Sequence, residues 1–171
     1  MKSVLGIIFA LPAEGRSILG KEYRVRSGGY PAVHFVRADK IFLLGVQAGM
    51  GCDSAFSAAR RLTDHGVAAL VSAGISGGLD PDLRTRDLVI SDRLRLIENS
   101  GPKSWFADSA GVSRSMEILR TAEVAVRQGL ILTADRPVPS VAEKTCLHKR
   151  FAALAVEIGR ASCRERVCHR V

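Results

Sequence analysis

Residues 67–79 read Val67-Ala-Ala-Leu-Val-Ser-Ala-Gly-Ile-Ser-Gly-Gly-Leu79, an apolar run that passes directly into a glycine-rich turn. An apolar run of this length, between Gly66 and Gly74, is typical of a strand buried on both faces of a sheet. Glycine at the end of such a strand lets the backbone approach a ligand closely, and free backbone amides there suit oxygen atoms and anions. The stretch therefore predicts an α/β fold with a ligand-binding turn at a strand end.

A second glycine turn, Ala48-Gly-Met-Gly51, follows another apolar run at 40–46 and precedes a predicted helix. It does not match a dinucleotide-binding fingerprint, because Ser54 stands where the third glycine is needed, and it lacks the Lys-Ser/Thr of a P-loop. Either turn taken alone could be a tight packing turn in an α/β sheet. Two such turns at strand ends of one sheet favour a shared small-molecule crevice.

Strand-like and helix-like segments alternate along the chain. We predict strands at residues 3–9, 21–26, 32–37, 40–46, 67–73, 87–97, 130–133 and 152–156. We predict helices at 12–19, 51–65, 113–128 and 140–150, and a loop at 98–110. The last helix opens with the capping box Ser140-Val-Ala-Glu143. This alternation predicts one α/β domain with a central mixed β-sheet flanked by helices.

Composition and charge narrow the function classes. Of 171 residues, 47% are hydrophobic and 25% charged, as in an average soluble globular domain. No apolar run approaches the ~18–20 residues needed to span a bilayer, and Pro12 and Glu14 stand where a signal peptide would be cleaved. We therefore expect a cytoplasmic protein. The net charge is +8, but the six Phe, two Tyr and one Trp are not interleaved with basic residues, so no nucleic-acid partner is expected.

Residues 158–171 differ in character from the rest of the chain. They show neither strand alternation nor a helical apolar stripe, and the string from Ile158 to Val167 resembles the translation of a common sequencing adapter. We expect an incomplete domain at 1–157 followed by a non-native tail at 158–171, with a short basic natural tail as the alternative.

The cysteines do not indicate a metal site or a disulfide framework. Cys163 and Cys168 fall in the tail, and Cys52 and Cys146 are isolated, without a CxxC pair or a histidine at ligand spacing. We expect no metal, and two thiols outside the tail fit a reducing compartment.

Glu14 is the first candidate for chemistry. It follows the first predicted strand in Ala10-Leu-Pro-Ala-Glu14, and a carboxylate at a strand end can accept a proton from an attacking water. The alternative is an exposed glutamate in the first turn of a helix, where the helix dipole favours a negative charge. Asp87, Asp92 and Asp135 are interpreted as turn residues.

Taken together and in order, these segments resemble the nucleoside phosphorylase and nucleosidase superfamily. The resembling stretches, spread over residues 3–157, are Ile7–Leu11 with Glu14, Ala48–Gly51, Ser72–Leu79, Arg86–Asp92, and Thr133–Asp135 through Ala155–Glu157. The resemblance implies a nucleoside phosphorylase-like α/β fold and cleavage of the N-glycosidic bond of a purine nucleoside. It implies that Glu14 helps to activate a nucleophilic water, as in 5′-methylthioadenosine/S-adenosylhomocysteine nucleosidases.

The resemblance also implies which residues surround the nucleoside. They are Ala48, Gly49, Met50, Gly51, Ile75, Ser76, Gly77, Gly78, Pro137, Val138 and Glu157. No cofactor is implied, and phosphate stays open as a co-substrate. The partner is a small-molecule nucleoside, and the full-length protein is expected to be a homo-oligomer.

Three stretches, 76–84, 138–144 and 147–148, are similar to the hopanoid-associated phosphorylase branch of that superfamily. This similarity implies adenosylhopane as the substrate and ribosylhopane as the product, with membrane association only through the lipid-like substrate. The alternatives are a 5′-methylthioadenosine/S-adenosylhomocysteine nucleosidase and, from another class, a noncatalytic nucleotide-binding α/β domain.

Several positions depart from the family pattern. Ile75 replaces a polar serine, and Ser72 and Glu14 stand at or near positions where phosphate-using relatives carry arginines, which favours water over phosphate as nucleophile. Pro137 replaces the aromatic residue that stacks on the purine. Ala155–Glu157 resembles the start of the family's Val-Glu-Met-Glu strand, whose second glutamate holds the ribose hydroxyls; that glutamate is absent here. The family's later Ser-Asp segment, whose aspartate protonates the purine, is absent too, so this chain is expected to be nearly inactive.

Overall fold

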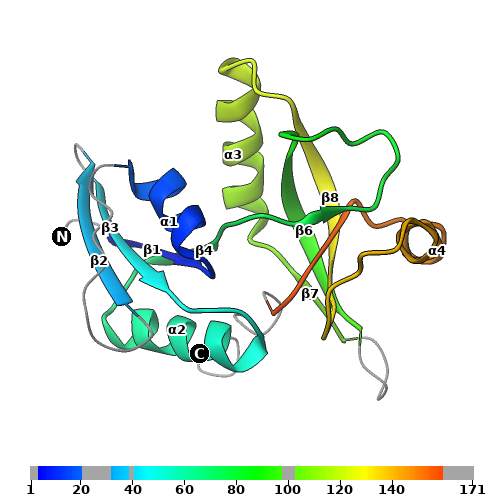
Figure 1. Cartoon of the computed structure of the whole chain (residues 1–171). Helices are drawn as coiled ribbons and strands as arrows, with labels where there is room; N and C mark the ends of the chain where they lie inside the picture. Colours follow the sequence, from blue (N-terminus) through cyan, green and yellow to red (C-terminus); the bar gives the residue numbers. More distant parts are fainter. Residues whose placement is uncertain (1–3, 21–31, 39–40, 98–102, 160–171) are drawn as a thin grey trace. The chain divides into compact units, whose positions relative to one another are not determined.

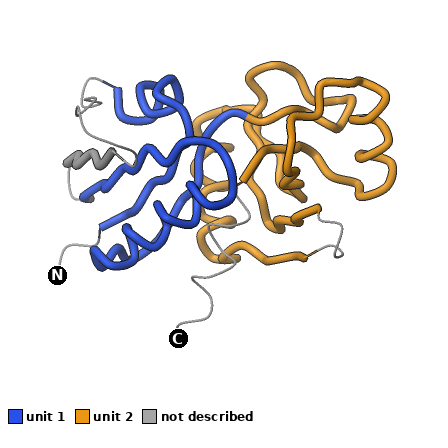
Figure 2. The backbone as a smooth tube through the Cα atoms, turned by 60° about the horizontal axis from the view of Figure 1, so that its bottom comes forward, with its two compact units in different colours: residues 1–75, 162–171 blue, residues 76–161 orange. Residues whose placement is uncertain are grey.

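The computed structural model describes residues 4–20, 32–38, 41–97 and 103–159 (Figure 1). The chain divides into two compact units, one of residues 1–75 with 162–171 and the other of residues 76–161 (Figure 2). The strand predicted at 21–26 and almost all of the predicted tail lie outside the described residues.

Within the described residues, each unit combines a mixed sheet with two helices. The first contains β1 (Val4–Phe9), α1 (Pro12–Leu19), β2 (Ala32–Ala38), β3 (Ile41–Gln47), α2 (Cys52–Asp64) and β4 (Ala69–Ser72). The second contains β5 (Gly77–Gly78), β6 (Leu88–Leu96), β7 (Lys103–Phe106), α3 (Ser109–Thr121), β8 (Val126–Thr133), α4 (Val141–Phe151) and β9 (Ala155–Glu157). The predicted α/β class, with mixed β-structure flanked by helices, is confirmed.

In the first unit the strands pair in the order β2-β3-β1-β4, with β1 parallel to both of its neighbours and β2 antiparallel to β3. The alternation of β1 side chains separates two apolar clusters. Ile8 packs with Leu62 of α2, whereas Ile7 and Phe9 pack with Leu19 of α1. The two helices therefore cover opposite faces of the sheet (Figure 1).

In the second unit the strands pair in the order β5-β9-β8-β6-β7, with β6, β8 and β9 parallel and the two outer strands antiparallel to their neighbours. Leu147 and Phe151 of α4 pack against a cluster that includes Leu130 and Leu132 of β8. Figure 1 shows α3 on the opposite side of these strands from α4. The parallel strands are thus covered by helices, as expected for parallel β-structure. The strand pairing gives one sheet in each unit, which refines the expected central sheet.

Two predicted elements between residues 98 and 129 were wrong. The segment predicted as a loop contains β7 and the start of α3. The helix starts there because Asp108 caps it by accepting a bond from the Gly111 N–H at 2.7 Å. The helix predicted at 113–128 ends at Thr121, and residues from Val126 onward form β8 instead. Parallel pairing with β6 decides this boundary, since tertiary pairing overrides a weak local helix preference.

The strand predicted as buried at 67–73 is shorter and more exposed than expected. β4 covers Ala69–Ser72, and its residues Ala69, Val71 and Ser72 are exposed. Among the described strands β4 pairs only with β1, so it lies at the edge of its sheet. Periodicity cannot distinguish an apolar edge strand from a central one.

Arg86 generates a prediction about stability. Its φ is +84°, a left-handed conformation that favours glycine. We expect Arg86→Gly to raise the free energy of unfolding by about 0.5–1 kcal/mol, because the relief of strain exceeds the added entropy of the unfolded chain. Urea unfolding measures the change. A lower urea midpoint in Arg86→Gly than in the parent chain would contradict the explanation.

Candidate active site at the strand ends

Glu14 is held in place by backbone donors from two separate segments. It is the third residue of α1, which begins at Pro12, and its Oε2 accepts bonds from the N–H groups of Ala10 and Leu11 at 2.8 and 2.9 Å. Its Oε1 accepts a bond from the Ile75 N–H at 2.7 Å. Glu14 is only 5% exposed, so the alternative of an exposed first-turn glutamate is wrong. These bonds tie the ends of β1 and β4 together and fix the orientation of the carboxylate.

The turn at 48–51 lies against the same end of β1. The Ala48 N–H donates to the Phe9 carbonyl at 2.8 Å, and the Gly49 N–H donates to the Ala10 carbonyl at 3.1 Å. Gly49 and Gly51 have φ values of +87° and +94°, which residues other than glycine rarely adopt. The turn therefore needs its glycines for its backbone conformation, and it joins the carboxyl end of β3 to that of β1.

Large apolar residues are exposed at these strand ends, Met50 and Ile75 most strongly. Met50 is 66% exposed and Ile75 is 73% exposed. Large apolar side chains next to a buried carboxylate can contact the apolar parts of a small molecule while the polar group orients it. In the first unit the structure thus brings together three groups named from the sequence: Glu14, the turn 48–51 that contains Met50, and Ile75.

The remaining predicted site residues belong to the second unit. Gly77 and Gly78 form β5 and pair antiparallel with Val156 and Ala155 of β9. Glu157, the last residue of β9, is buried and accepts a bond from the Thr133 hydroxyl of β8. Thr133 and Glu157 face each other in the parallel register, so this bond locks the ends of the two strands.

The other predicted site residues of this unit, Ser76, Pro137 and Val138, are less closely tied to the sheet than Gly77, Gly78 and Glu157. Pro137 is exposed and Val138 packs beside the apolar cluster under α4, while Ser76 is half-buried. The boundary between the units falls between Ile75 and Ser76, inside the glycine turn.

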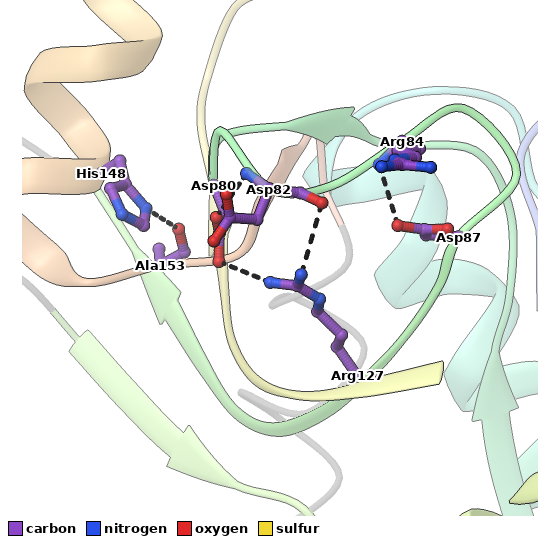
Figure 3. A network of polar contacts seen from close by, with 7 residues as sticks. All are labelled: Asp80, Asp82, Arg84, Asp87, Arg127, His148 and Ala153. Atoms are coloured by element: carbon purple, nitrogen blue, oxygen red, sulfur yellow. Dashed lines mark hydrogen bonds and ion pairs between the residues drawn. The ribbon is translucent and has the colours of Figure 1, made fainter. Parts of the chain in front are cut away.

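An ion pair anchors the turn that follows β5 (Figure 3). Arg127 of β8 contacts the Asp80 carboxylate at 3.1 Å and donates to the Asp82 carbonyl at 3.3 Å. The Leu79 and Asp80 N–H groups both donate to the Leu154 carbonyl, at 2.9 and 3.2 Å. The two glycines of β5 are therefore held against β9 by contacts on the residues that follow them.

Sequence reasoning missed Thr133 and Arg127 as partners of the site residues. Thr133 ends the apolar run of β8, where a lone hydroxyl in a buried strand was an available signal. No local sequence pattern indicates the role of Arg127, because its partner Asp80 is 47 residues away in the chain. In the described parts of the chain no group of three or more His, Cys, Asp or Glu residues is placed to hold a metal ion. None of the helices described is both long and apolar enough to cross a bilayer.

The sequence model of the Phosphorylase superfamily matches residues 5–158, which is most of the chain. The chain belongs to the Phosphorylase superfamily.

Curated relatives of this superfamily member include purine nucleoside phosphorylases of the DeoD type. That of Streptococcus pyogenes is 26% identical over 142 residues, covering 78% of this chain and 58% of the relative. That of Streptococcus thermophilus is 25% identical over 142 residues, covering 78% of this chain and 64% of the relative. The chain thus spans about three fifths of the length of the curated relatives it matches.

Solved structures similar to this superfamily member include two nucleosidases and a hydrolase. A 5′-methylthioadenosine/S-adenosylhomocysteine nucleosidase from Neisseria meningitidis gives a TM-score of 0.83 at 22% identity, covering 99% of this chain and 80% of that one. A putative nucleosidase of the same kind from Francisella philomiragia also gives 0.83 at 22% identity, with 95% and 78% covered. Futalosine hydrolase from Helicobacter pylori gives 0.80 at 19% identity, with 95% and 77% covered. Likeness at these identities shows the shared fold.

The bonds around Glu14 generate a prediction. Glu14→Gln replaces one acceptor oxygen with an NH2 group, so at least one of the three backbone N–H groups loses its acceptor in either amide orientation. We expect the free energy of unfolding to fall by about 1–3 kcal/mol, measured by urea denaturation. The control is Glu117→Gln on the exposed face of α3, which should change stability by less than about 0.5 kcal/mol. Equal losses of unfolding free energy in Glu14→Gln and Glu117→Gln would contradict the structural role of Glu14.

A second prediction concerns the Asp80–Arg127 pair. The two side chains are 14% and 40% exposed, so their pairing is partly shielded from water. A double-mutant cycle of Asp80→Asn and Arg127→Met should give a coupling of about 0.5–1.5 kcal/mol. The matched cycle on Arg60 and Asp64, which lie 4.0 Å apart and are 70% and 68% exposed, should give about 0.3–0.5 kcal/mol or less. Indistinguishable couplings would show that Arg127 does not anchor the turn after β5.

Proposed function

We propose that this chain binds an adenosine-type nucleoside and cleaves its N-glycosidic bond. The observation that carries the proposal is the buried Glu14 carboxylate, held between the glycine turn 48–51 and the segment that follows β4. Membership of the Phosphorylase superfamily supports the reaction class, since the relatives named above are nucleoside phosphorylases and the structural neighbours include nucleosidases.

The proposed reaction separates charge at the sugar. The C–N bond breaks, the base leaves with the bonding electrons, and the anomeric carbon becomes cation-like until a nucleophile attacks it. Glu14 acts on the nucleophile: its carboxylate orients an attacking water and accepts the proton that the water loses. Backbone bonds from Ala10, Leu11 and Ile75 keep the carboxylate oriented, which limits the reorganisation needed at the moment of reaction.

We assign the remaining predicted residues to contacts with the sugar and the base. In the proposal, the backbone of the turn 48–51 lies beside the ribose, and the exposed side chains of Met50 and Ile75 contact the apolar surface of the nucleoside. Ser76, Gly77 and Gly78 line the nucleoside site. Pro137 and Val138 take the position of the loop that contacts the purine, and Glu157 ends the strand that precedes the ribose contacts.

Among nucleosides, we propose adenosylhopane as the specific substrate. The stretches 76–84 and 138–144, which are similar to the hopanoid-associated branch, support this choice. 5′-Methylthioadenosine and S-adenosylhomocysteine are the competing substrates, because nucleosidases for them are among the structural neighbours.

The test is adenine release under single-turnover conditions, with the protein in excess over adenosine, 5′-methylthioadenosine or adenosylhopane. Adenine formed only when the protein is present supports the proposal. Nucleoside binding without any adenine release would favour the noncatalytic alternative, and absence of both binding and release would overturn the proposal.

Ile75→Ala tests the site without disturbing a buried side chain. Because the Ile75 side chain is 73% exposed, its truncation should leave the unfolding midpoint nearly unchanged and weaken nucleoside binding about tenfold, or about 1.4 kcal/mol. Titration calorimetry measures the affinity. The control is Val141→Ala on α4, another β-branched side chain, 78% exposed, which should leave the affinity unchanged. Equal affinities in the two variants would place the nucleoside away from Ile75.

A further inference from the structure

Two arginines of β6 lie on the face of the second sheet that α4 covers. Arg93 and Arg95 pair in register with two residues of β8, Leu130 and Leu132, which pack into the apolar cluster beneath α4. Because registered residues of neighbouring strands share a face, as do residues two apart in one strand, both arginines are on the α4 side. The Arg95 guanidinium lies 5.5 Å from the centre of the Phe151 ring of α4, in agreement with this placement.

The Phe151 ring brings a second guanidinium group close to that of Arg95. Arg150, the residue before Phe151 in α4, places its guanidinium 5.0 Å from the centre of the same ring. The ring attracts each cation, but the two cations repel each other. Arg95 cannot turn away freely, because its Nε donates to the Ser104 hydroxyl of β7 at 3.0 Å. An anion bound beside the two groups would relieve the repulsion.

Arg93 adds a third positive charge whose hydration is incomplete. The residue is half-buried, and its Nε is buried without a hydrogen-bond acceptor among the described residues. Such orphaned donors are rare in folded proteins, and a charged group that loses water without gaining a partner costs free energy. A negative charge beside the guanidinium would offset part of that cost.

Within the described residues no carboxylate forms an ion pair with Arg93, Arg95 or Arg150. Asp92, the neighbour of Arg93 in the chain, accepts a bond from the Gln128 side-chain amide at 3.1 Å instead. The three guanidinium groups therefore lack a counter-charge from the described chain.

An exposed aromatic residue borders this group of arginines. Phe106 of β7 pairs directly opposite Arg93 and is 73% exposed. Opposite residues of an antiparallel pair share a face, with Cβ atoms about 4.5–5.5 Å apart. A molecule that carries an anionic group next to a flat apolar group can therefore contact an arginine and the ring together.

We propose that this face binds the phosphate group of a small aromatic molecule. We call it the arginine face, formed by Arg93, Arg95, Arg150 and Phe106. Guanidinium groups match phosphate oxygens in geometry, and a phosphate monoester carries about −1.5 to −2 charges at pH 7, which suits three arginines better than a single carboxylate does.

The inference goes beyond the proposed function. In the second sheet β8 and β9 lie between β6, which carries Arg93 and Arg95, and the glycine strand β5. Glu14 and the turn 48–51 belong to the first unit. The arginine face is thus a site separate from the residues assigned to the nucleoside.

The phosphate group has two sources, free phosphate and a phosphate ester, and the probes distinguish them. Phenyl phosphate supplies the anion and a ring, inorganic phosphate supplies the anion alone, and phenol supplies the ring alone. None of the three contains a nucleoside, so the result does not depend on whether this chain cleaves one.

The first experiment uses Arg93→Met, which keeps an unbranched side chain and removes the charge. Arg114→Met on the exposed face of α3 is the matched control. Phenyl phosphate at tenfold excess over its dissociation constant should raise the thermal midpoint of the parent chain and of the control by about 3–5 °C, compared with chloride at equal ionic strength. Arg93→Met should bind about tenfold more weakly and lose most of the shift. Without ligand its midpoint should not fall, because the orphaned Nε is gone.

The second experiment tests the ring and does not depend on the folding of Arg93→Met. Phe106→Ala removes a side chain that is 73% exposed, so the fold should be unaffected. It should weaken the binding of phenyl phosphate about fivefold, measured by titration calorimetry, and leave that of inorganic phosphate unchanged. Ile118→Ala on α3, where the side chain is 56% exposed, is the control and should change neither affinity.

Each outcome decides one point. Equal shifts by phenyl phosphate in the parent chain, Arg93→Met and Arg114→Met, or a shift by phenol as large as that by phenyl phosphate, would overturn the site. Binding that requires Arg93 but is equal for inorganic phosphate and phenyl phosphate, and is unchanged in Phe106→Ala, supports the phosphate site and assigns it to free phosphate. Binding that requires both Arg93 and Phe106 supports the site and assigns it to a phosphate ester.

Discussion

The bonds from three backbone amides to the Glu14 carboxylate are the constraint on which the first unit's candidate site depends. Glu14 is only 5% exposed as a residue, so its carboxylate loses hydration on folding, and hydrogen bonds to the charged group must offset that loss. Two donors, Ala10 and Leu11, come from the end of β1, and the third, Ile75, lies 61 residues away in the chain. One side chain thereby holds two strand ends together, and the same bonds fix its own orientation.

Close packing imposes a second constraint on the same unit. A Cβ at Gly6, in the central strand β1, would lie 2.7 Å from Leu70 Cδ2 and 3.2 Å from side-chain atoms of Leu62 and Val67. The space beside β1 is therefore already filled by α2 and by the segment leading through β4. This packing sets the spacing of the strands whose carboxyl ends carry Glu14, and a site built on buried strands is positioned more accurately than one built on a loop alone.

Local patterns predicted the elements that depend on local interactions. The helix predicted at 12–19 is α1, and the capping box at Ser140 opens α4, where the Ser140 hydroxyl accepts a bond from the Glu143 N–H at 3.4 Å. Local patterns failed where pairing decided the outcome. Residues 126–129 are part of a strand because they pair with β6. The strand β7 forms in a predicted loop because it pairs with the C-terminal half of β6.

By itself, the sequence determined the α/β class, the glycine turns after β3 and β4, and Glu14 as the carboxylate at the end of β1. These follow from short-range periodicity, from glycine's access to positive φ and from residue order, all of which are local properties. Only the tertiary structure decided that Glu14 is buried, that Arg127 holds Asp80, and that Arg95 lies over the Phe151 ring. Each of these joins residues far apart in the chain, so they exist only once the strands and helices have packed.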